Sequence, residues 1–241
     1  MNHDPVRWTS HAVSHVGTVR KINEDACLDL PAAGLWAVAD GMGGHSSGDV
    51  ASRSIVTALQ ALPATDSLAM LADHVEDALE RVNTELRELA ESASRHTIGS
   101  TVVVLAIRRR HALIAWAGDS RVYRLREGRL EQLTQDHAIV EDMVEIGLIS
   151  REEALAHPQA NRITRAVGAM EALYLDMDIH EIAPGDRFLL CSDGLYKELG
   201  DNDIARVLGG RGNTAKAAVD LAVERGARDN VTAVTIAVEK A

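Results

Sequence analysis

Apolar residues recur along the chain in two patterns, one typical of amphipathic helices and one typical of buried strands. Between residues 67 and 93, leucines and valines recur at steps of three and four, which predicts a long helix with one core-facing stripe. Short aliphatic and β-branched runs that end at turn signals predict strands. The predicted strands are 35–39, 101–107, 111–117, 121–125, 130–133, 188–191 and 231–238, and the other predicted helices are 49–62, 139–149, 201–208 and 214–225.

The order of these elements indicates the architecture. Strands come in runs with helices in pairs between them, which differs from the strict alternation of a parallel sheet. Stacked antiparallel sheets with helices outside fit this order. No repeat or Pro/Gly/Ser-rich linker interrupts the sequence, so we expect residues 1–241 to form a single domain. The polar stretch 150–162 is interpreted as a mobile connection.

Composition narrows the classes of partner. The formal net charge is −11, which makes nucleic acid a poor partner because its binding depends on basic side chains. The arginine triplet 108–110 is interpreted as a solvated turn between strands. Cys27 and Cys191 stand outside any C-x-x-C pair and are expected to be buried thiols, with a regulatory disulfide as the alternative. A polar start and the lack of a long apolar run predict a cytoplasmic protein without a membrane partner.

Five aspartates stand next to predicted strand ends: Asp25, Asp40, Asp119, Asp193 and Asp229. A carboxylate in such a place is held on a rigid support, and a following glycine lets a backbone carbonyl approach an ion closely. Hard divalent cations favour these oxygen ligands. Any one of the five, taken alone, is better explained as a turn residue, since Asp-Gly is a common turn signal. Their joint presence therefore has to be weighed together with the neighbouring residues.

Those neighbours form seven short motifs in a fixed order: VRKINED at 19–25, ADGMGGH at 39–45, GST at 99–101, GDSR at 118–121, ITRAVG at 163–168, CSDGL at 191–195 and RDN at 228–230. Together they resemble the type 2C family of metal-dependent protein phosphatases in its compact bacterial form. The resemblance runs from about residue 14 to residue 238. One such motif would be weak evidence, whereas seven in order are very specific.

The resemblance implies an α+β fold, a four-layer α/β/β/α sandwich with two central antiparallel sheets flanked by antiparallel helix pairs. It implies one type 2C phosphatase domain over 1–241, in which a flap at about 139–162 borders the cleft and influences substrate choice. It also implies a centre of Mn²⁺ or Mg²⁺ ions at the sheet edges. In that centre Asp40 would bridge two metals, the Gly41 carbonyl would bind one of them, and Asp193 and Asp229 would complete the shell of the other.

The same resemblance assigns the remaining roles. Asp25 would hold metal-bound water, with Glu24 as a possible helper, and Asp119 would join Asp193 in binding a third ion, which gives two to three ions per chain. Arg20 would clamp the substrate phosphate. Where animal members carry a histidine that is thought to protonate the leaving oxygen, this chain has Met42, which cannot do so. His45 or metal-bound water would then serve as the acid.

The chemistry of phosphate esters supports these roles. A phosphate monoester hydrolyses slowly, so the enzyme has to supply a strong nucleophile and stabilise charge. Water shared by two cations loses its proton near neutral pH and attacks in line. The cations also balance five carboxylates that would otherwise raise one another's pKa. The planar guanidinium group of an arginine can donate hydrogen bonds to two phosphate oxygens at once.

We therefore expect a phosphatase that acts on phosphoserine and phosphothreonine in proteins and counteracts a bacterial serine/threonine kinase. Its partners would be phosphorylated proteins and the cognate kinase, and we expect a monomer. A narrower version places it in a secretion-system phosphorylation circuit. The alternatives are a pseudophosphatase that only binds, which would lack a metal-binding aspartate, and a regulator dedicated to one anti-sigma-factor antagonist, which would usually carry sensor or membrane segments.

Overall fold

The computed structural model of the chain describes residues 6–43, 47–93 and 97–241. The strands are β1 (Val6–His15), β2 (Asp25–Leu30), β3 (Leu35–Met42), β4 (Gly99–Ser100), β5 (Val102–Arg108), β6 (His111–Ala117), β7 (Arg121–Arg126), β8 (Arg129–Gln132), β9 (Asp176–Glu181), β10 (Arg187–Cys191) and β11 (Val231–Lys240). The helices are η1 (Pro31–Ala33), α1 (Ser47–Gln60), α2 (Leu68–Ser92), α3 (Ile139–Glu145), α4 (Arg151–Leu155), α5 (Asp193–Tyr196), α6 (Asp201–Leu208) and α7 (Thr214–Glu224).

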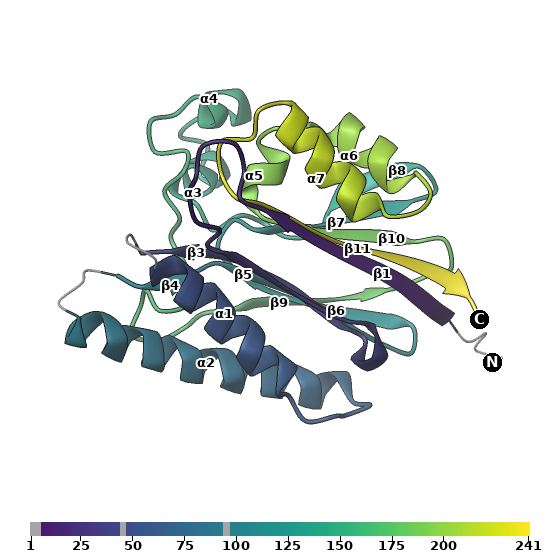
Figure 1. The fold of residues 1–241 in the computed structure, drawn as a ribbon, viewed down its shortest axis with the longest axis horizontal. Helices are drawn as coiled ribbons and strands as arrows, with labels where there is room; N and C mark the ends of the chain where they lie inside the picture. Colours follow the sequence, from purple (N-terminus) through teal and green to yellow (C-terminus); the bar gives the residue numbers. More distant parts are fainter. Residues whose placement is uncertain (1–5, 44–46, 94–96) are drawn as a thin grey trace.

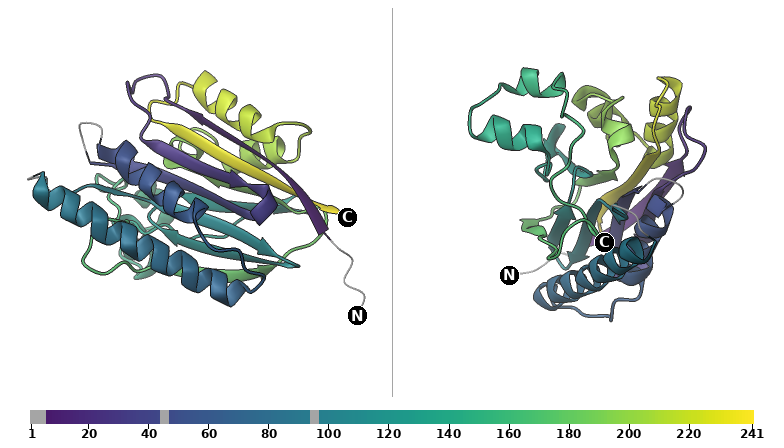
Figure 2. Two further views of the ribbon diagram at one scale, coloured as in Figure 1. Left: turned by 60° about the horizontal axis from the view of Figure 1, so that its bottom comes forward. Right: turned by 90° about the vertical axis from the view of Figure 1, so that its left-hand side faces the viewer.

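The strands form two antiparallel sheets that lie face to face (Figure 1). One has the order β1-β11-β10-β7-β8, and the other has the order β2-β3-β5-β6-β9 with β4 paired to β3. Helices α1 and α2 cover the outer face of the second sheet, and α6 and α7 cover the outer face of the first (Figure 1). The predicted four-layer α/β/β/α sandwich is confirmed. Helices α3 and α4 project from one end of it, as Figure 2 also shows.

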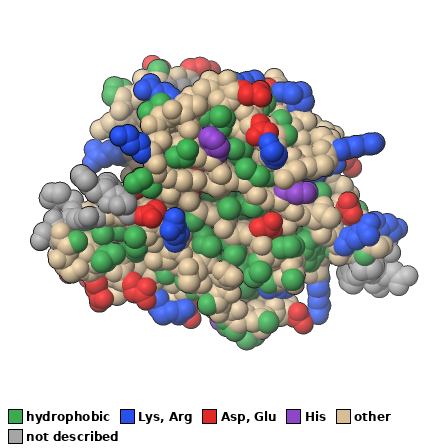
Figure 3. All heavy atoms as spheres, viewed as in Figure 1, with side chains coloured by type: hydrophobic (Ala, Val, Ile, Leu, Met, Phe, Trp, Pro, Cys, Tyr) green, Lys and Arg blue, Asp and Glu red, His purple; other side chains and the backbone are tan. Residues whose placement is uncertain are grey.

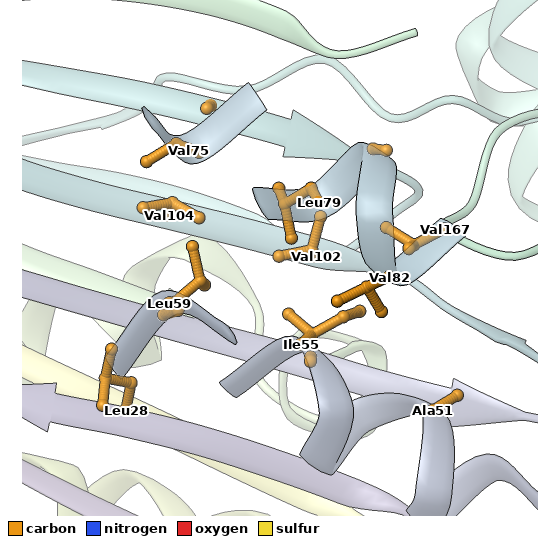
Figure 4. Packing of buried hydrophobic residues seen from close by; sticks show 14 of the residues in the cluster. Leu28, Ala51, Ile55, Leu59, Val75, Leu79, Val82, Val102, Val104 and Val167 are labelled. Atoms are coloured by element: carbon orange, nitrogen blue, oxygen red, sulfur yellow. The ribbon is translucent and has the colours of Figure 1, made fainter. Parts of the chain in front are cut away.

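The central strands read as unbroken apolar runs because both of their faces are buried. In β5, Val103 and Leu105 face the space between the sheets, whereas Val102 and Val104 face the helices. This follows from the alternation of side chains along a strand. Figure 4 shows the helical side of this packing, where Ile55 and Leu59 of α1 and Leu79 and Val82 of α2 meet the strand. The long predicted stripe is therefore a core face, as expected.

Edge strands are the main elements that were not predicted from the sequence. Strands β1, β2 and β9 lie at sheet edges, where part of each strand faces solvent, so their residues mix polar and apolar types without a continuous run. The stretch 150–162, interpreted from the sequence as a mobile connection, contains the short helix α4. Ser150 accepts from the Glu153 backbone N–H and the Glu153 carboxylate accepts from Ser150 N–H, which forms a capping box.

Several smaller expectations concern the surface and the cysteines. Arg109 has φ of 55° and lies in the predicted turn between β5 and β6. Cys27 and Cys191 are free thiols, and burial raises the pKa of each, to about 11 and about 12. Acidic and basic side chains are interspersed over the face seen in Figure 3. Within the described ranges, no helix is long and apolar enough to cross a membrane.

Candidate active site

A polar cleft of about 350 Å³ opens at the end of the sandwich that carries α3 and α4. Its walls come from loops and strand ends of both sheets and from the segment that follows α4. The residues that line it are Arg20, Glu24, Asp40, Gly41, Met42, Gly43, Thr101, Asp119, Asn161, Ile163, Asp193, Asp229 and Asn230. Four of the five aspartates predicted from the sequence thus share one cleft, although they are separated by up to 189 positions, from 40 to 229.

Asp40 lies within β3 rather than at its end, and its backbone is fixed on both sides. Its N–H donates to Thr101 Oγ1 at 3.2 Å, and its carbonyl accepts from Thr101 N at 2.9 Å and Ser100 Oγ at 2.9 Å. The following Gly41 passes so close to Gly48 that a Cβ there would lie 2.0 Å from the Gly48 carbonyl oxygen. Only glycine fits this approach. Ser100 and Thr101 therefore position Asp40.

Asp25 lies beneath the cleft rather than in its wall. It opens β2 and stands opposite Asp40 in the antiparallel register, where two like charges repel. Its Oδ2 accepts from Thr232 Oγ1 at 2.6 Å, on β11 of the other sheet, and from Ser192 Oγ at 2.8 Å, which directly follows β10 of that sheet. Its Oδ1 is buried without a hydrogen-bond partner. Asp25 thus ties the two sheets together and leaves one buried carboxylate oxygen without a hydrogen-bond partner.

Asp193 and Asp229 each meet a basic side chain. Lys197 Nζ lies 2.5 Å from Asp193 Oδ2, and Arg20 Nη2 lies 2.7 Å from Asp229 Oδ2. Asp193 follows β10 and opens α5, whereas Asp229 precedes β11, so Asp229, like Asp25, stands at a strand start rather than an end. Arg20, predicted to clamp phosphate, lies in the cleft wall and is paired there with Asp229.

Asn230 holds the N-terminal loop against this site. Its Oδ1 accepts from Glu24 N–H at 2.8 Å, and its Nδ2 donates to the carbonyls of Val16 and Ile22, each at 3.0 Å. Its own N–H donates to Asp229 Oδ1 at 2.9 Å. Asn230 thus orients this part of the site, because its side chain fixes the loop that bears Arg20 and its backbone N–H fixes the neighbouring carboxylate.

The negative charge of the carboxylate cluster exceeds the positive charge of the side chains around it. Burial raises the pKa of Asp25 to about 7, that of Asp119 to about 6, and that of Asp40 well above its ordinary value. Repulsion from the neighbouring aspartates, Asp193 among them, raises all three further. Such a cluster is stable in its ionised form only with added positive charge.

These residues fit a divalent cation by their chemistry. Carboxylates, the peptide carbonyl of Gly41 in the cleft wall and the unpartnered Oδ1 of Asp25 are the kind of oxygen donors that Mn²⁺ and Mg²⁺ prefer. In the part of the chain that the structure describes, no three histidine, cysteine or acidic residues already form a ready metal-binding group. Release of the contacts from Lys197 and Arg20 would free one oxygen each on Asp193 and Asp229.

The loop before Asp119 is anchored by His137. Its Nδ1 accepts from Gly118 N–H at 3.1 Å, so Nε2 carries the proton and faces Asp176 Oδ2 at 3.1 Å. Arg165, which follows the flap, donates to the other oxygen of Asp176 at 2.6 Å. This chain of contacts links the base of the flap to the Asp119 loop, so His137 and Arg165 have a structural role here.

Several residues of the site were missed by the sequence predictions. Ser192 lies inside a quoted motif, but nothing local shows that it reaches Asp25. Lys197 and Tyr196 lie just beyond that motif, and their spacing of four and three from Asp193 on a helix was the available signal. Asn161 lines the cleft from the flap, which no local pattern indicated. His45, a candidate acid, lies outside the described residues.

A two-sheet sandwich with a carboxylate-lined cleft at one end is typical of metal-dependent phosphatases. The sequence profile described as Protein phosphatase 2C matches residues 14–220. The chain is 35% identical over 226 residues to the serine/threonine protein phosphatase PstP of Mycobacterium tuberculosis, covering 92% of this chain and 43% of that protein.

Solved structures agree. A structure titled "PppA, a key regulatory component of T6SS in Pseudomonas aeruginosa" is 44% identical, with a TM-score of 0.90 and coverage of 96% of this chain and 98% of that one. The catalytic domain of PstP in complex with two manganese ions is 32% identical, with a TM-score of 0.87 and coverage of 97% and 99%. The chain belongs to the protein phosphatase 2C family of metal-dependent serine/threonine phosphoprotein phosphatases. The predicted family, enzyme class and Mn²⁺ or Mg²⁺ dependence are confirmed.

Proposed function

We propose that this cleft hydrolyses phosphoserine and phosphothreonine in proteins and that its five aspartates hold the divalent ions. The observation that carries the proposal is the convergence of Asp40, Asp119, Asp193 and Asp229 on one cleft with Arg20 at its rim. Acidic side chains alone would repel a phosphate group. Bound divalent ions reverse the sign of the local charge, which reconciles an anionic substrate with an acidic chain.

The individual roles are those that the resemblance to the family implies, and the place of each residue in or beneath the cleft is compatible with them. We assign Asp40 as the ligand shared by two ions, with the Gly41 carbonyl on one of them and Asp193 and Asp229 on the other. Asp119 would join Asp193 in holding a further ion. Asp25, one layer deeper, would act through water by its unpartnered Oδ1. Ions held there would lower the pKa of bound water and offset charge on the phosphoryl oxygens.

The protein's own side chains have to bind the phosphate and complete the proton transfers. Arg20 is half of an ion pair with Asp229, and its exposed guanidinium can turn towards a phosphate without leaving the cleft rim. Its planar fork suits two phosphate oxygens. The leaving serine or threonine oxygen must gain a proton, which Met42 in the cleft wall cannot donate. His45 stays the candidate donor, to be tested by comparing His45→Ala on a phosphopeptide and on an aryl phosphate.

Substrate choice is assigned to the flap. Asn161 and Ile163 bring its C-terminal end into the cleft wall, whereas the exposed apolar residues Ile146 and Leu148 lie between α3 and α4. Shortening the flap should therefore alter phosphopeptide preference more than turnover of a small aryl phosphate. Equal losses on both substrates would contradict this role.

The physiological partners proposed are phosphorylated proteins, a cognate serine/threonine kinase and the targets of that kinase. The likeness to PppA, titled a key regulatory component of T6SS, favours a secretion-system phosphorylation circuit as the setting. We expect the chain to act as a monomer, which light scattering on the purified protein measures. If the autophosphorylated cognate kinase loses its phosphate when this protein is added, the proposed pairing of kinase and phosphatase is supported.

The decisive experiment measures phosphate release from a phosphothreonine peptide with Mn²⁺, with chelator, and with Asp193→Ala. We expect activity only with the metal and the intact aspartate. Asp220→Ala is the matched control, because Asp220 also pairs with a lysine but lies on α7, outside the residues that line the cleft. Phosphopeptide binding without release of phosphate would instead favour a pseudophosphatase, and equal activity of Asp193→Ala would refute the assigned site.

A further inference from the structure

Helix α5 brings two side chains to the carboxylates of the cleft. It begins at Asp193, and Lys197 follows its last turn, so that Lys197 Nζ lies 2.5 Å from Asp193 Oδ2. Tyr196, one position earlier, directs its hydroxyl at Asp119 Oδ2 over 3.4 Å. The Tyr196 ring is itself held by the Arg121 guanidinium, 3.6 Å from its centroid. Asp119 and Asp193 therefore each already have a donor from the same short segment.

The contact between Lys197 and Asp193 differs from an ordinary helical ion pair. Lys216 and Asp220 on α7 have the same spacing and the same 2.5 Å separation, but their side chains are 62% and 52% exposed. In the cleft pair, the Asp193 side chain is only 18% exposed and lines the cavity. Lys197 is also close enough to Asp119 and Asp40 to interact with both electrostatically. The Lys197 ammonium thus attracts three carboxylates electrostatically rather than one.

A count of charges shows what this ammonium does. The cleft and the layer beneath it contain five aspartates. Two divalent ions bring four positive charges and Lys197 brings a fifth, which equals the charge of the five aspartates, whereas Glu24, which also lines the cleft, lies near Arg20. A further divalent ion at Asp119 and Asp193 would have to share the Asp193 carboxylate with the ammonium, and two cations on one carboxylate repel each other. The lysine and the ion therefore compete.

We propose that Lys197 is a built-in counter-cation of the Asp119–Asp193 pair, which weakens the uptake of a divalent ion at that pair and leaves two ions bound tightly. This inference rests on the proposed function, because it assumes that the five aspartates bind metal. It assigns to a residue outside the motifs a role in setting how many ions the enzyme holds. Tyr196 supports this role by fixing Asp119 beside the ammonium.

The test is a Mn²⁺ titration by calorimetry, with equilibrium dialysis and metal analysis to count ions. Lys197→Gln should bind the weakest of its ions about fivefold more tightly than the wild type, the factor that corresponds to about 1 kcal/mol for a partly exposed ion pair. Lys197→Arg retains the charge and should behave as the wild type. Lys216→Gln removes the matched pair on α7 and should leave Mn²⁺ uptake unchanged.

Further variants make the outcome specific to the site. The gain in Lys197→Gln should disappear when Asp119→Asn is added, since the extra affinity is assigned to that pair. Lys197→Met repeats the charge removal without a hydrogen-bonding head group, and thermal unfolding in chelator verifies that each variant is folded. If folded Lys197→Gln and Lys197→Met bind the same number of ions with unchanged affinities, the counter-cation role is refuted while the proposed function stands. If the wild type binds no Mn²⁺, the proposed function itself fails.

Discussion

Asp25 provides the most direct test of the electrostatics of this site, because it is a buried carboxylate beside other carboxylates. Among the residues that the structure describes, its carboxylate accepts hydrogen bonds only from Ser192 and Thr232, both on Oδ2, and Oδ1 has no partner. Without a cation, ionisation of Asp25 opposes folding. We therefore predict that Asp25→Asn stabilises the metal-free protein and at the same time removes its activity.

The size and pH dependence of the effect follow from the pKa of Asp25. Burial raises this pKa from 3.8 to about 7 in the folded chain. Between these pH values the Asp25 carboxyl is ionised in the unfolded chain and protonated in the folded chain. The free energy of unfolding therefore falls as pH rises from 3.8 and levels off above about 7. At about 1.4 kcal/mol per tenfold change, the wild type loses up to about 4 kcal/mol at pH 8 and about 2 kcal/mol at pH 5.5. The neutral amide of the variant avoids both losses.

The assay is urea unfolding with chelator at the two pH values. The stabilisation by Asp25→Asn should be larger at pH 8 than at pH 5.5 by up to about 2 kcal/mol. Asp29→Asn is a suitable control, because Asp29 is an exposed carboxylate on the same strand. With saturating Mn²⁺ the order of stability should reverse, since the wild type retains the carboxylate. Destabilisation by Asp25→Asn, or an equal effect at both pH values, would refute this account of the cleft.

Three further predictions concern other parts of the site. In Gly194→Ala the new Cβ would lie 2.0 Å from the Asn230 carbonyl oxygen, so α5 must shift and the free energy of unfolding, measured in urea, should fall by about 2 kcal/mol. Arg20→Lys keeps the charge but loses the fork, so the KM for a phosphopeptide in steady-state kinetics should rise about tenfold. Mn²⁺ at a hundred times its Kd should stabilise the wild type by about 2.7 kcal/mol in thermal unfolding, and chelator should reverse this.

Each of these has a result that would count against it. Unchanged stability of Gly194→Ala would mean that α5 does not press on the strand start at Asn230. An unchanged KM with a lower kcat in Arg20→Lys would move Arg20 from substrate binding to the chemical step. Equal unfolding temperatures with and without Mn²⁺ would show that the folded chain has no preference for the ion over the unfolded chain.

The comparison of sequence and structure separates local from long-range information. The stripe of α2 and the apolar runs of β5 and β6 are local patterns, and each lies where the periodicity placed it. Helix α4 was missed although Ser150 and Glu153 carry a helix-start signal, because the polar composition of the flap outweighed it. Edge strands such as β1 and β9 need a neighbouring strand to become ordered, and no local pattern reveals that neighbour.

The sequence by itself determined the family, the sandwich architecture and the five aspartates, because these depend on residue types at fixed spacings. Tertiary structure alone decided which side chains meet. It placed Asp25 opposite Asp40 and against Thr232 of the other sheet and Ser192 of the turn after β10, and it set Arg20 against Asp229. The physical reason is that these contacts join segments from different sheets and loops. Their electrostatic consequences exist only once packing has brought the charges within a few ångströms of one another.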